Sequence, residues 1–585
     1  MEQFTFCNPV PFSDGKRHTN PDPFVLRWCG AYYCYATDEA GIKVSVSEDL
    51  VHWQDKGYAI RQQGHQNFWA PAVLYENGIF YLYYSHEPKE ILQLATSHDP
   101  LGPFVWQMQL SELFSIDAHP VLWHGDRYLF YASDEWMGCE EERPGTSILL
   151  DKLCPDGSLE GHPVPVVLPD ADEEIFARNR FGDGRDWHTL EGPCLLAGEE
   201  RSFLMYSANC YESEYYYVHY AVAENKEDLR EMVWHKQEKP HAPFPLLHRS
   251  EMVEGTGHNT VVQAPDLVHW WIIYHGRPAE ESIIKGIEQR QMYIAPLRTW
   301  DDVLWTPAPT TAPQEEPQKP NFYCVQKHLV AQERWEICTV PETALFEMWF
   351  HPQIKHTGVH FSLFLAELNE QNWLELTFST GRRQITIWEN WRGIRRCIAQ
   401  TELPRGFAMF VPHLLTITGR FGEWSVCLDG KKILKAASRL REGNLSVKAN
   451  HSEVTFYGLS MTQWFSLTGS ELMFLTDWLT VSPAELTEIG LYGHRGILQI
   501  EMGNFPHSEE TFLFCKPGSC AVLIGGEICA RIDWELGSIQ LRRICIDDQC
   551  RFFANEEQIW SGERNKNMAL LIENAWLHQY SFAGL

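Results

Sequence analysis

One short pattern of strands recurs five times between residues 18 and 310, and it constrains the fold more than any other feature of the sequence. In its first copy, Asp22 stands between two prolines and precedes three predicted strands at 24–28, 32–36 and 42–47. Proline removes a ladder donor and fixes the backbone, so Asp22 is expected where a strand begins. A meander of short antiparallel strands is the unit of one β-propeller blade. The four later copies begin near residues 67, 115, 189 and 255.

The starts of four copies carry side chains that can do acid–base chemistry. These residues are Asp22, Asp117, Glu191 and His258. The first strand of each blade lines the central channel of a propeller, so the four are expected to meet on one axis. Each has an ordinary explanation when taken alone, since an aspartate beside proline is usually a turn residue. Their shared position at blade starts favours a functional site.

The chain beyond the propeller is expected to form β-sandwiches. Residues 306–320 carry five prolines and indicate a stiff linker. The all-β domains predicted are a five-bladed propeller at 1–310, a linker at 311–343, and β-sandwiches at 344–463 and 464–585. The segment 414–434 has a weaker echo at 538–560, which suggests that the second sandwich is a divergent copy of the first.

Composition and charge narrow the range of partners. The net charge of −30, from 78 acidic and 48 basic residues, would repel a polyanion and argues against nucleic acid and anionic membrane surfaces. No apolar run approaches the ~18 residues needed to cross a bilayer. Aromatic residues make up 13% of the chain, and such side chains can stack on sugar rings. The sequence leaves the oligomeric state open.

The N-terminus and the cysteines predict a cytoplasmic location. Residues Met1–Thr5 show neither the basic nor the apolar region of a signal peptide. The 16 cysteines include no C-x-x-C pair. Cys545 and Cys550 are five positions apart, an odd offset that puts them on opposite faces of one continuous strand. We therefore expect reduced thiols, and a disulfide framework only if the sequence has lost a leader.

Five segments, in the right order, resemble the signature segments of glycoside hydrolase family 43. They are HTNPDPFV, NFWAPAVLYENGIFYLYYS, SIDAHPVLWHGDRYLFYAS, TLEGPCLLAGEERSFLMYSA and GTGHNTVVQ. The resemblance covers residues 18 to about 310, and the tail resembles concanavalin-like sandwiches only loosely. It implies inverting enzymes on a five-bladed β-propeller, typically arabinofuranosidases, xylosidases or arabinanases.

The resemblance implies a role for each of three carboxyl groups. Asp22 matches the general base, Glu191 the general acid, and Asp117 the aspartate that tunes the acid and orients the substrate. Inverting hydrolysis needs one ionised carboxylate to activate water and one protonated carboxyl group at the leaving oxygen. A third carboxylate close to the acid would raise its pKa by like-charge repulsion.

Three more residues match substrate-binding positions of the family. Trp69 matches the active-site tryptophan, whose face offers apolar contact to a sugar. Arg290 resembles the arginine that faces the acidic pair. His258 matches the axial histidine, which in many members sits beside calcium or another ion; the resemblance thus implies a structural Ca²⁺ on the axis near His258. The sequence departs from the family at Ala118-His119-Pro120, where many members have proline directly after the aspartate.

These observations predict an exo-acting inverting glycosidase that releases terminal pentose units from oligosaccharides, of the α-L-arabinofuranosidase or β-D-xylosidase type. A β-D-galactofuranosidase of the same fold and a non-catalytic carbohydrate-binding propeller are the alternatives. The retaining fructosidase class is disfavoured, because the chain has Asn20-Pro21-Asp22-Pro23 in place of Asn-Asp-Pro-Asn and has no Arg-Asp-Pro. Motifs of zinc proteases, α/β-hydrolases and P-loop proteins are absent from the sequence.

Overall fold

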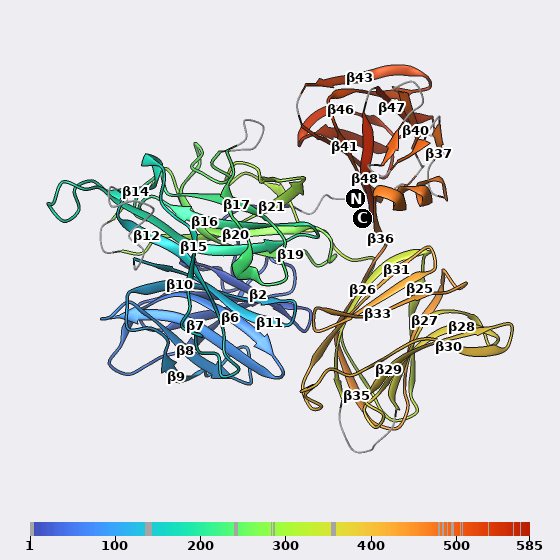
Figure 1. Cartoon of the computed structure of the whole chain (residues 1–585), viewed down its shortest axis with the longest axis horizontal. Helices are drawn as coiled ribbons and strands as arrows, with labels where there is room; N and C mark the ends of the chain where they lie inside the picture. The colour runs from blue at the N-terminus through green and yellow to red at the C-terminus, as the bar shows by residue number, and fades with distance from the viewer. Residues whose placement is uncertain are drawn as a thin grey trace. The chain divides into compact units, whose positions relative to one another are not determined.

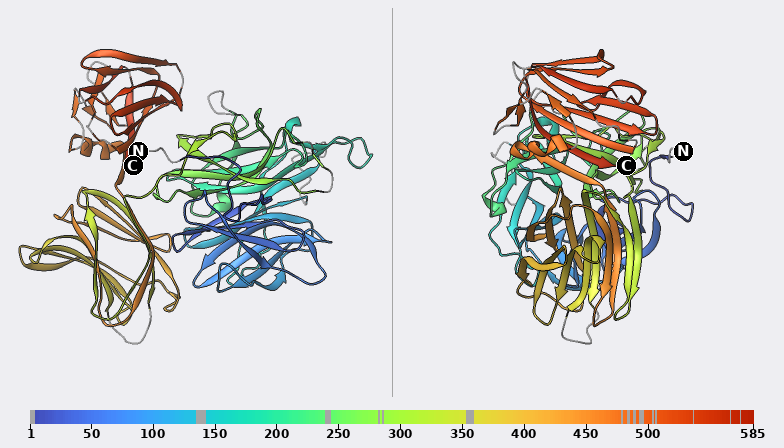
Figure 2. Two further views of the ribbon diagram at one scale, coloured as in Figure 1. Left: turned by 180° about the vertical axis from the view of Figure 1, so that it is seen from behind. Right: turned by 90° about the vertical axis from the view of Figure 1, so that its right-hand side faces the viewer.

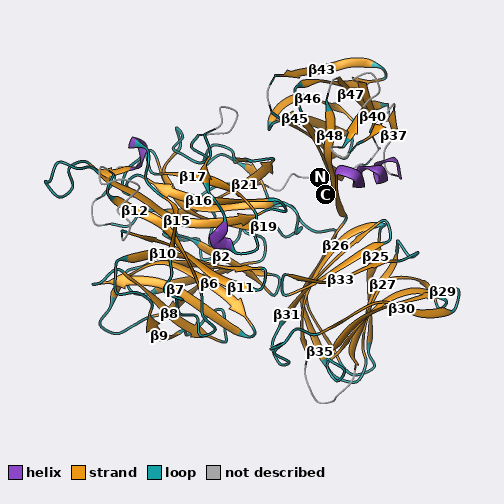
Figure 3. Ribbon diagram, viewed as in Figure 1, coloured by secondary structure: helices purple, strands orange, loops and turns teal. Residues whose placement is uncertain are grey.

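The structure, a computed structural model, is built almost entirely of β-strands (Figures 1 and 3). It describes residues 5–134, 143–238, 244–281, 283–284, 287–352, 359–477, 480–482, 485–487, 490–492, 497–502, 505, 507–535, 537–565, 567–573 and 575–585. The helices in these ranges are short 3-10 segments: η1 (Asp172–Glu174), η2 (Leu229–Glu231) and η3 (Gly469–Asp477). None of the described helices is long and apolar enough to cross a membrane. The predicted all-β class is confirmed.

Five antiparallel meanders form the blades of the propeller. Blade I contains β2 (Phe24–Trp28), β3 (Ala31–Ala36), β4 (Ile42–Ser47) and β5 (Gln54–Ile60). Blade II contains β6 (Gln66–Glu76), β7 (Ile79–Glu87), β8 (Ile91–Ser97) and β9 (Val105–Gln109). Blade III contains β10 (Ser115–Trp123), β11 (Asp126–Ser133), β12 (Gly145–Lys152) and β13 (Val164–Val167). Every blade therefore begins where the repeated sequence pattern placed it.

The last two blades complete the same arrangement. Blade IV contains β15 (Trp187–Ala197), β16 (Arg201–Ala208), β17 (Tyr217–Glu224) and β18 (His235–Lys236). Blade V contains β19 (Val253–Gln263), β20 (Trp270–Pro278), β21 (Gln291–Trp300) and β22 (Val303–Trp305). A short parallel pairing of β12 with β15, to which β14 (Ile175–Ala177) adds, joins blades III and IV in one sheet.

Shared hydrophobic cores close the blades into a ring. The second strands read as nearly continuous apolar runs, such as WWIIY in β20, because both faces of each blade are covered. Separate buried clusters join blade I to II, II to III, III to IV and IV to V. A fifth cluster joins V back to I, where Val25 and Tyr32 pack with Trp271 and Ile294.

The N-terminal segment before blade I is hydrogen-bonded to blade V and to the strand that follows it. Strand β1 (Thr5–Phe6) pairs with β23 (Gln314–Glu315). The side chain of Asn8 bonds the backbone of β21 in both directions: Nδ2 donates to the Ile294 carbonyl at 2.8 Å, and Oδ1 accepts from the Ile294 amide at 3.0 Å. The two ends of the propeller sequence thus meet at blade V.

A residue with left-handed backbone conformation stands at the start of every blade. The five residues are Asp22 (φ 52°), Ala70 (44°), Asp117 (60°), Gly192 (58°) and His258 (44°). In blades II to V they coincide with register shifts between the first and second strands. A bulge of this kind re-aims a side chain, and strained non-glycine residues collect at functional sites. The positions that the sequence marked for chemistry are thus the strained positions of the ring.

The first sandwich has two six-stranded sheets. One contains, in spatial order, β24 (Phe322–Leu329), β35 (Val454–Thr462), β26 (Thr343–Pro352), β31 (His413–Arg420), β32 (Glu423–Leu428) and β33 (Lys431–Ala437). The other contains β25 (Arg334–Val340), β34 (Gly443–Ala449), β27 (Val359–Asn369), β28 (Asn372–Ser379), β29 (Gln384–Trp391) and β30 (Ile394–Glu402). The sheets meet through rings such as Phe350 and Phe361, whose centroids lie 5.1 Å apart.

The range expected as a linker, 311–343, contains two strands of this sandwich. Strands β24 and β25 pair with β35 and β34, so the sandwich begins at Phe322. The two strands were missed because the alternation of polar with apolar residues is weak in both and one face stays exposed. By its contacts the chain divides into two compact units, one holding the propeller and the other holding both sandwiches.

The second sandwich repeats the strand order of the first. Both are seen from two further sides in Figure 2. One sheet contains β36 (Trp464–Thr468), β48 (Trp576–Gly584), β41 (His507–Cys515), β44 (Ile539–Ile546), β45 (Gln549–Ala554) and β46 (Glu557–Glu563), with β38 (Glu485–Leu486) and β39 (Leu491–Tyr492) at its edge. The other contains β37 (Thr480–Ser482), β40 (Ile497–Glu501), β47 (Met568–Glu573), β42 (Gly518–Ile524) and β43 (Glu527–Trp534). The first sheet matches β24-β35-β26-β31-β32-β33 strand for strand, which supports the predicted internal repeat.

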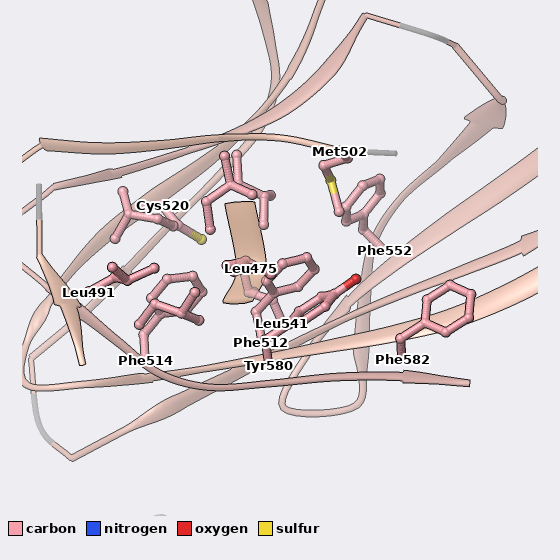
Figure 4. Close-up of a cluster of buried hydrophobic side chains, with 14 of the residues drawn as sticks. Leu475, Leu491, Met502, Phe512, Phe514, Cys520, Leu541, Phe552, Tyr580 and Phe582 are labelled. Carbon is pink, nitrogen blue, oxygen red and sulfur yellow. The ribbon is translucent and has the colours of Figure 1, made fainter. Parts of the chain in front are cut away.

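Side chains from both sheets fill the core of the second sandwich. Phe512 and Leu541 come from one sheet and Cys520 from the other (Figure 4). Cys545 and Cys550, which face each other across β44 and β45, form a disulfide within this core. The expectation of reduced thiols on opposite faces is wrong for this pair, because a turn between them places the two cysteines on different strands.

Candidate active site

Asp22 is a buried carboxylate held by two strong donors. Thr37 Oγ1 donates to Oδ2 at 2.6 Å, and Arg290 Nη1 donates to Oδ1 at 3.0 Å. Burial opposes ionisation of Asp22, but Arg290 and two histidines outweigh it and hold its pKa well below the usual range. Asp22 is therefore ionised at neutral pH and available to accept a proton.

Contacts with Glu288 and Tyr211 hold the guanidinium group of Arg290 in place beside Asp22. Glu288 accepts from Arg290 Nε at 3.0 Å and from Nη2 at 2.8 Å, a two-pronged pairing that orients the guanidinium group. The ring of Tyr211 lies 5.0 Å from the guanidinium carbon. This arrangement leaves Nη1 for Asp22, so the positive charge and its direction are both set by the protein.

Glu191, which is half-buried on β15, has a different partner. The hydroxyl group of Tyr216 donates to Glu191 Oε1 at 2.6 Å. Burial raises the pKa of Glu191, Tyr216 and Arg290 lower it, and the charge of Asp22 raises it, with a net value of about 7. Glu191 is therefore protonated below neutral pH and can give up its proton within the physiological range.

Asp117 is a third buried carboxyl group at a blade start. Its Oδ2 accepts from the backbone amide of Gly192 at 2.9 Å. Burial and the nearby charges of Glu191 and Asp22 raise the pKa of Asp117 well above its usual range. The tuning of the acid by Asp117 stays a prediction.

His258 lies between two of the carboxyl groups. Its Nδ1 is 3.5 Å from Asp22 Oδ1 and 3.5 Å from Asp117 Oδ2. Burial lowers the pKa of His258, and Arg290 adds to this effect while Asp22 opposes it. The imidazole is thus neutral at neutral pH and serves as a spacer between the carboxyl groups.

Hydrogen bonds between neighbouring blades fix three of the strained residues. The donor in each bond is the backbone amide of a left-handed residue. The acceptor is a side chain at or near the end of the second strand in the preceding blade. The pairs are Thr37 Oγ1 with Ala70 N (2.9 Å), Ser207 Oγ with His258 N (2.7 Å) and His275 Nδ1 with Asp22 N (3.1 Å). Because Nδ1 of His275 accepts, its proton is on Nε2, and burial lowers the pKa of His275 to about 4.

The structure brings together most of the residues that the sequence singled out. Five of them lie close enough to shift one another's pKa values: Asp22, Asp117, Glu191, His258 and Arg290. Trp69 is half-buried on β6, one residue before Ala70, whose amide bonds Thr37. Its contact with a sugar stays a prediction.

Sequence reasoning missed four residues that hold the site in place: Thr37, Tyr216, His275 and Glu288. Thr37 and His275 stand at equivalent points of blades I and V, so aligning second strands as well as first strands would have revealed them. Tyr216 carries no such signal, because it lies in the connection between β16 and β17. Gly257 lies within β19 beside Tyr216.

The described residues offer few ligands for the predicted calcium ion. Among the described residues, no group of three or more His, Cys, Asp and Glu side chains could hold a metal ion. Calcium prefers six to eight oxygen ligands, whereas His258 offers one imidazole nitrogen. An ion near His258 would therefore take most of its ligands from water.

Opposite protonation of two buried carboxyl groups on one axis defines the chemistry available here. At neutral pH and below, Asp22 is charged while Glu191 retains a proton. One group can accept a proton from water and the other can donate one to a leaving group. The fold and this site thus define a β-propeller with a candidate acid–base site built from the first strands of its blades.

Residues 11–302 match the model of the glycosyl hydrolases family 43. This range includes every site residue described above and all of the five blades except β22, the last strand of blade V. The chain belongs to this family.

Individual relatives share part of the chain. A probable arabinan endo-1,5-α-L-arabinosidase C of Aspergillus clavatus is 34% identical over 14% of this chain and 27% of the relative. An extracellular exo-α-(1→5)-L-arabinofuranosidase of Streptomyces avermitilis is 21% identical over 46% of this chain and 58% of the relative. The chain thus spans from about a quarter to under two thirds of these two relatives. A solved structure of a thermostable family-43 glycoside hydrolase is 31% identical, with a TM-score of 0.46, over 54% of this chain and 100% of that one.

The predicted cytoplasmic location is contradicted. The Streptomyces avermitilis relative, which matches 301 residues, is an extracellular enzyme. The disulfide between Cys545 and Cys550 agrees with this correction, because such bonds persist in oxidising compartments.

Proposed function

We propose that this protein is an exo-acting inverting glycosidase that releases terminal pentose units, of the α-L-arabinofuranosidase or β-D-xylosidase type, from oligosaccharides. The observation that carries the proposal is the opposite protonation of Asp22 and Glu191 on the propeller axis. A sugar-binding propeller without chemistry would not need a charged carboxylate and a protonated carboxyl group buried in the same site.

Asp22 acts as the general base in this proposal. Arg290 and Thr37 hold both of its oxygens, which fixes the plane of the carboxylate. Water lying on the face of the sugar opposite the leaving group gives its proton to Asp22 as it attacks the anomeric carbon. The low pKa of Asp22 keeps this base ionised far into the acidic range.

Glu191 acts as the general acid. It gives its proton to the glycosidic oxygen while the bond to the anomeric carbon breaks, so the product leaves as a neutral alcohol. A pKa of about 7 leaves Glu191 protonated at mildly acidic pH and ionised at alkaline pH. The rate should therefore fall as the pH rises through 7, because the acid loses its proton.

The pentose specificity rests on the relatives. One is an exo-acting arabinofuranosidase of Streptomyces avermitilis, and another is a non-reducing end α-L-arabinofuranosidase of Bacteroides ovatus. A putative β-xylosidase of Xylanibacter ruminicola supports the second sugar. Nitrophenyl α-L-arabinofuranoside, β-D-xyloside and β-D-galactofuranoside distinguish these readings, and hydrolysis of the last alone would favour a galactofuranosidase.

The stereochemistry of the first product tests the mechanism. With Asp22 as base, we expect the released sugar to appear first with inverted anomeric configuration and then to mutarotate. Proton NMR of the anomeric signal in the first minutes of turnover records this order. Retained configuration would indicate a covalent intermediate and would remove Asp22 from the role of base.

We further propose that a calcium ion on the axis, held by His258 and water, stabilises the propeller without taking part in proton transfer. Exhaustive chelation is then expected to lower the Tm by several degrees, because a ligand that binds only the folded state adds to its stability. Added Ca²⁺ should restore the Tm, with His258→Ala as the variant that no longer responds. An unchanged Tm and rate after chelation would remove the ion from the proposal.

A further inference from the structure

Tyr216 is locked beside Glu191 by its surroundings. Its ring is buried and stacks on the His275 imidazole, with centroids 5.7 Å apart and planes 6° from parallel. Strand β19 passes so close that a Cβ atom on Gly257 would lie 1.9 Å from Tyr216 Cε1. Glycine at position 257 therefore creates the space for the ring, and the ring can place its hydroxyl group in one direction only.

The hydroxyl group of Tyr216 can act only as a donor toward Glu191. Burial raises the pKa of Tyr216 well above its usual range, and the charge of Glu191 adds to this, so the phenol keeps its proton. That proton is directed at Glu191 Oε1, 2.6 Å away. When Glu191 is itself protonated, a proton on Oε1 would compete with the phenol proton, so the acidic proton is expected on Oε2.

Thr37 has the corresponding relation to the base. Its Oγ1 accepts from the Ala70 amide at 2.9 Å, which directs its single proton to Asp22 Oδ2 at 2.6 Å. Each catalytic carboxyl group thus has one oxygen committed to a hydroxyl donor.

We propose that Tyr216 is a positioning residue that makes Oε2 of Glu191 the oxygen that delivers the proton to the leaving group, with Thr37 as its counterpart at the base. This inference rests on the proposed function, because it assigns oxygens to an acid and a base. It names Tyr216 as acting through Glu191 and not on the substrate.

The test compares Tyr216→Phe with Thr37→Val, which remove one hydroxyl group each and keep the shape. A hydroxyl group that donates to a carboxylate favours the ionised form, so Tyr216→Phe should raise the pKa of Glu191. We expect the alkaline limb of the kcat/KM profile to move up by about one pH unit. Thr37→Val should move the acidic limb upward instead and leave the alkaline limb in place.

Leaving groups give a second readout. A misdirected acid slows substrates whose leaving oxygen needs protonation, so Tyr216→Phe should lower kcat about tenfold or more on an oligosaccharide. The kcat on nitrophenyl glycosides should fall far less, because nitrophenolate departs without a proton. Thr37→Val should slow both substrates alike, because water must be activated in either case.

Two outcomes would overturn the inference. If Tyr216→Phe leaves the alkaline limb in place, or slows both substrates equally at an unchanged Tm, its role is structural only. A wild-type enzyme that hydrolyses no glycoside would instead remove the proposed function itself. Gly257→Ala, which displaces the ring, should reproduce the pH shift of Tyr216→Phe and add nothing to it in the double variant, so the result does not depend on a single substitution.

Discussion

Asp22→Ala is expected to abolish hydrolysis of every glycoside, whereas Glu191→Ala should abolish hydrolysis of oligosaccharides and spare an activated aryl glycoside. The base is needed whatever leaves, because water must be deprotonated for attack. The acid is needed only when the leaving oxygen is a poor one, since nitrophenolate departs without a proton. Losses of about 10²–10⁴-fold are typical for such groups. Steady-state kcat/KM for one nitrophenyl glycoside and one oligosaccharide measures the difference.

A carboxylate far from the axis provides the control for this experiment. Asp55 is exposed on β5, where its side chain bonds only the backbone of Gly57. Asp55→Ala should keep wild-type rates on both substrates. Equal losses on both substrates for Glu191→Ala would exclude Glu191 as the acid, and a loss of less than about tenfold on either substrate for Asp22→Ala would exclude Asp22 as the base.

Glu510→Ala is expected to destabilise the second sandwich by about 3–5 kcal/mol, because it removes one partner of a buried ion pair. Glu510 and Arg543 face each other across β41 and β44, both almost fully buried. Arg543 Nε donates to Glu510 Oε2 at 2.5 Å, and the Tyr580 hydroxyl donates to Oε1 at 2.9 Å. Urea unfolding, followed by tryptophan fluorescence, measures the loss.

The double variant Glu510→Leu/Arg543→Leu should recover much of this loss, since replacing a whole buried ion pair by apolar groups is often neutral. Glu527→Ala, at an exposed position of β43, is the matched control and should stay within about 0.5 kcal/mol of the wild type. A loss below about 1 kcal/mol for Glu510→Ala would show that the pair contributes little.

The blade starts could be predicted from the sequence because each is marked by local chemistry. Asp22 between two prolines and Glu191 before Gly192-Pro193 are signals carried by neighbouring residues. Their meeting on one axis followed from the repeat, which places equivalent positions of a propeller together. Protonation did not follow in the same way. Both pKa shifts depend on groups from other blades: Arg290 lowers the pKa of Asp22, and Glu191 and Asp22 raise that of Asp117.

Two errors have the same physical origin. Cys545 and Cys550 were treated as neighbours on one strand, whereas a two-residue turn puts them across a hairpin. Strands β24 and β25 were assigned to a linker because their alternation is weak and one face stays exposed. The number of residues between two positions tells whether they share a face only if no turn separates them. The positions of the turns outside the signature segments could not be predicted from the sequence.

The inter-blade hydrogen bonds have a consequence for how the protein is made. Asp22 leaves the ribosome well before Arg290 and His275, which hold its charge and its amide and follow it by about 250 residues. A nascent chain, or a fragment cut within blade IV, thus carries a base without the groups that ionise and orient it. Because both groups belong to blade V, we expect activity only after the final blade has docked, so that hydrolysis would report the integrity of the whole ring.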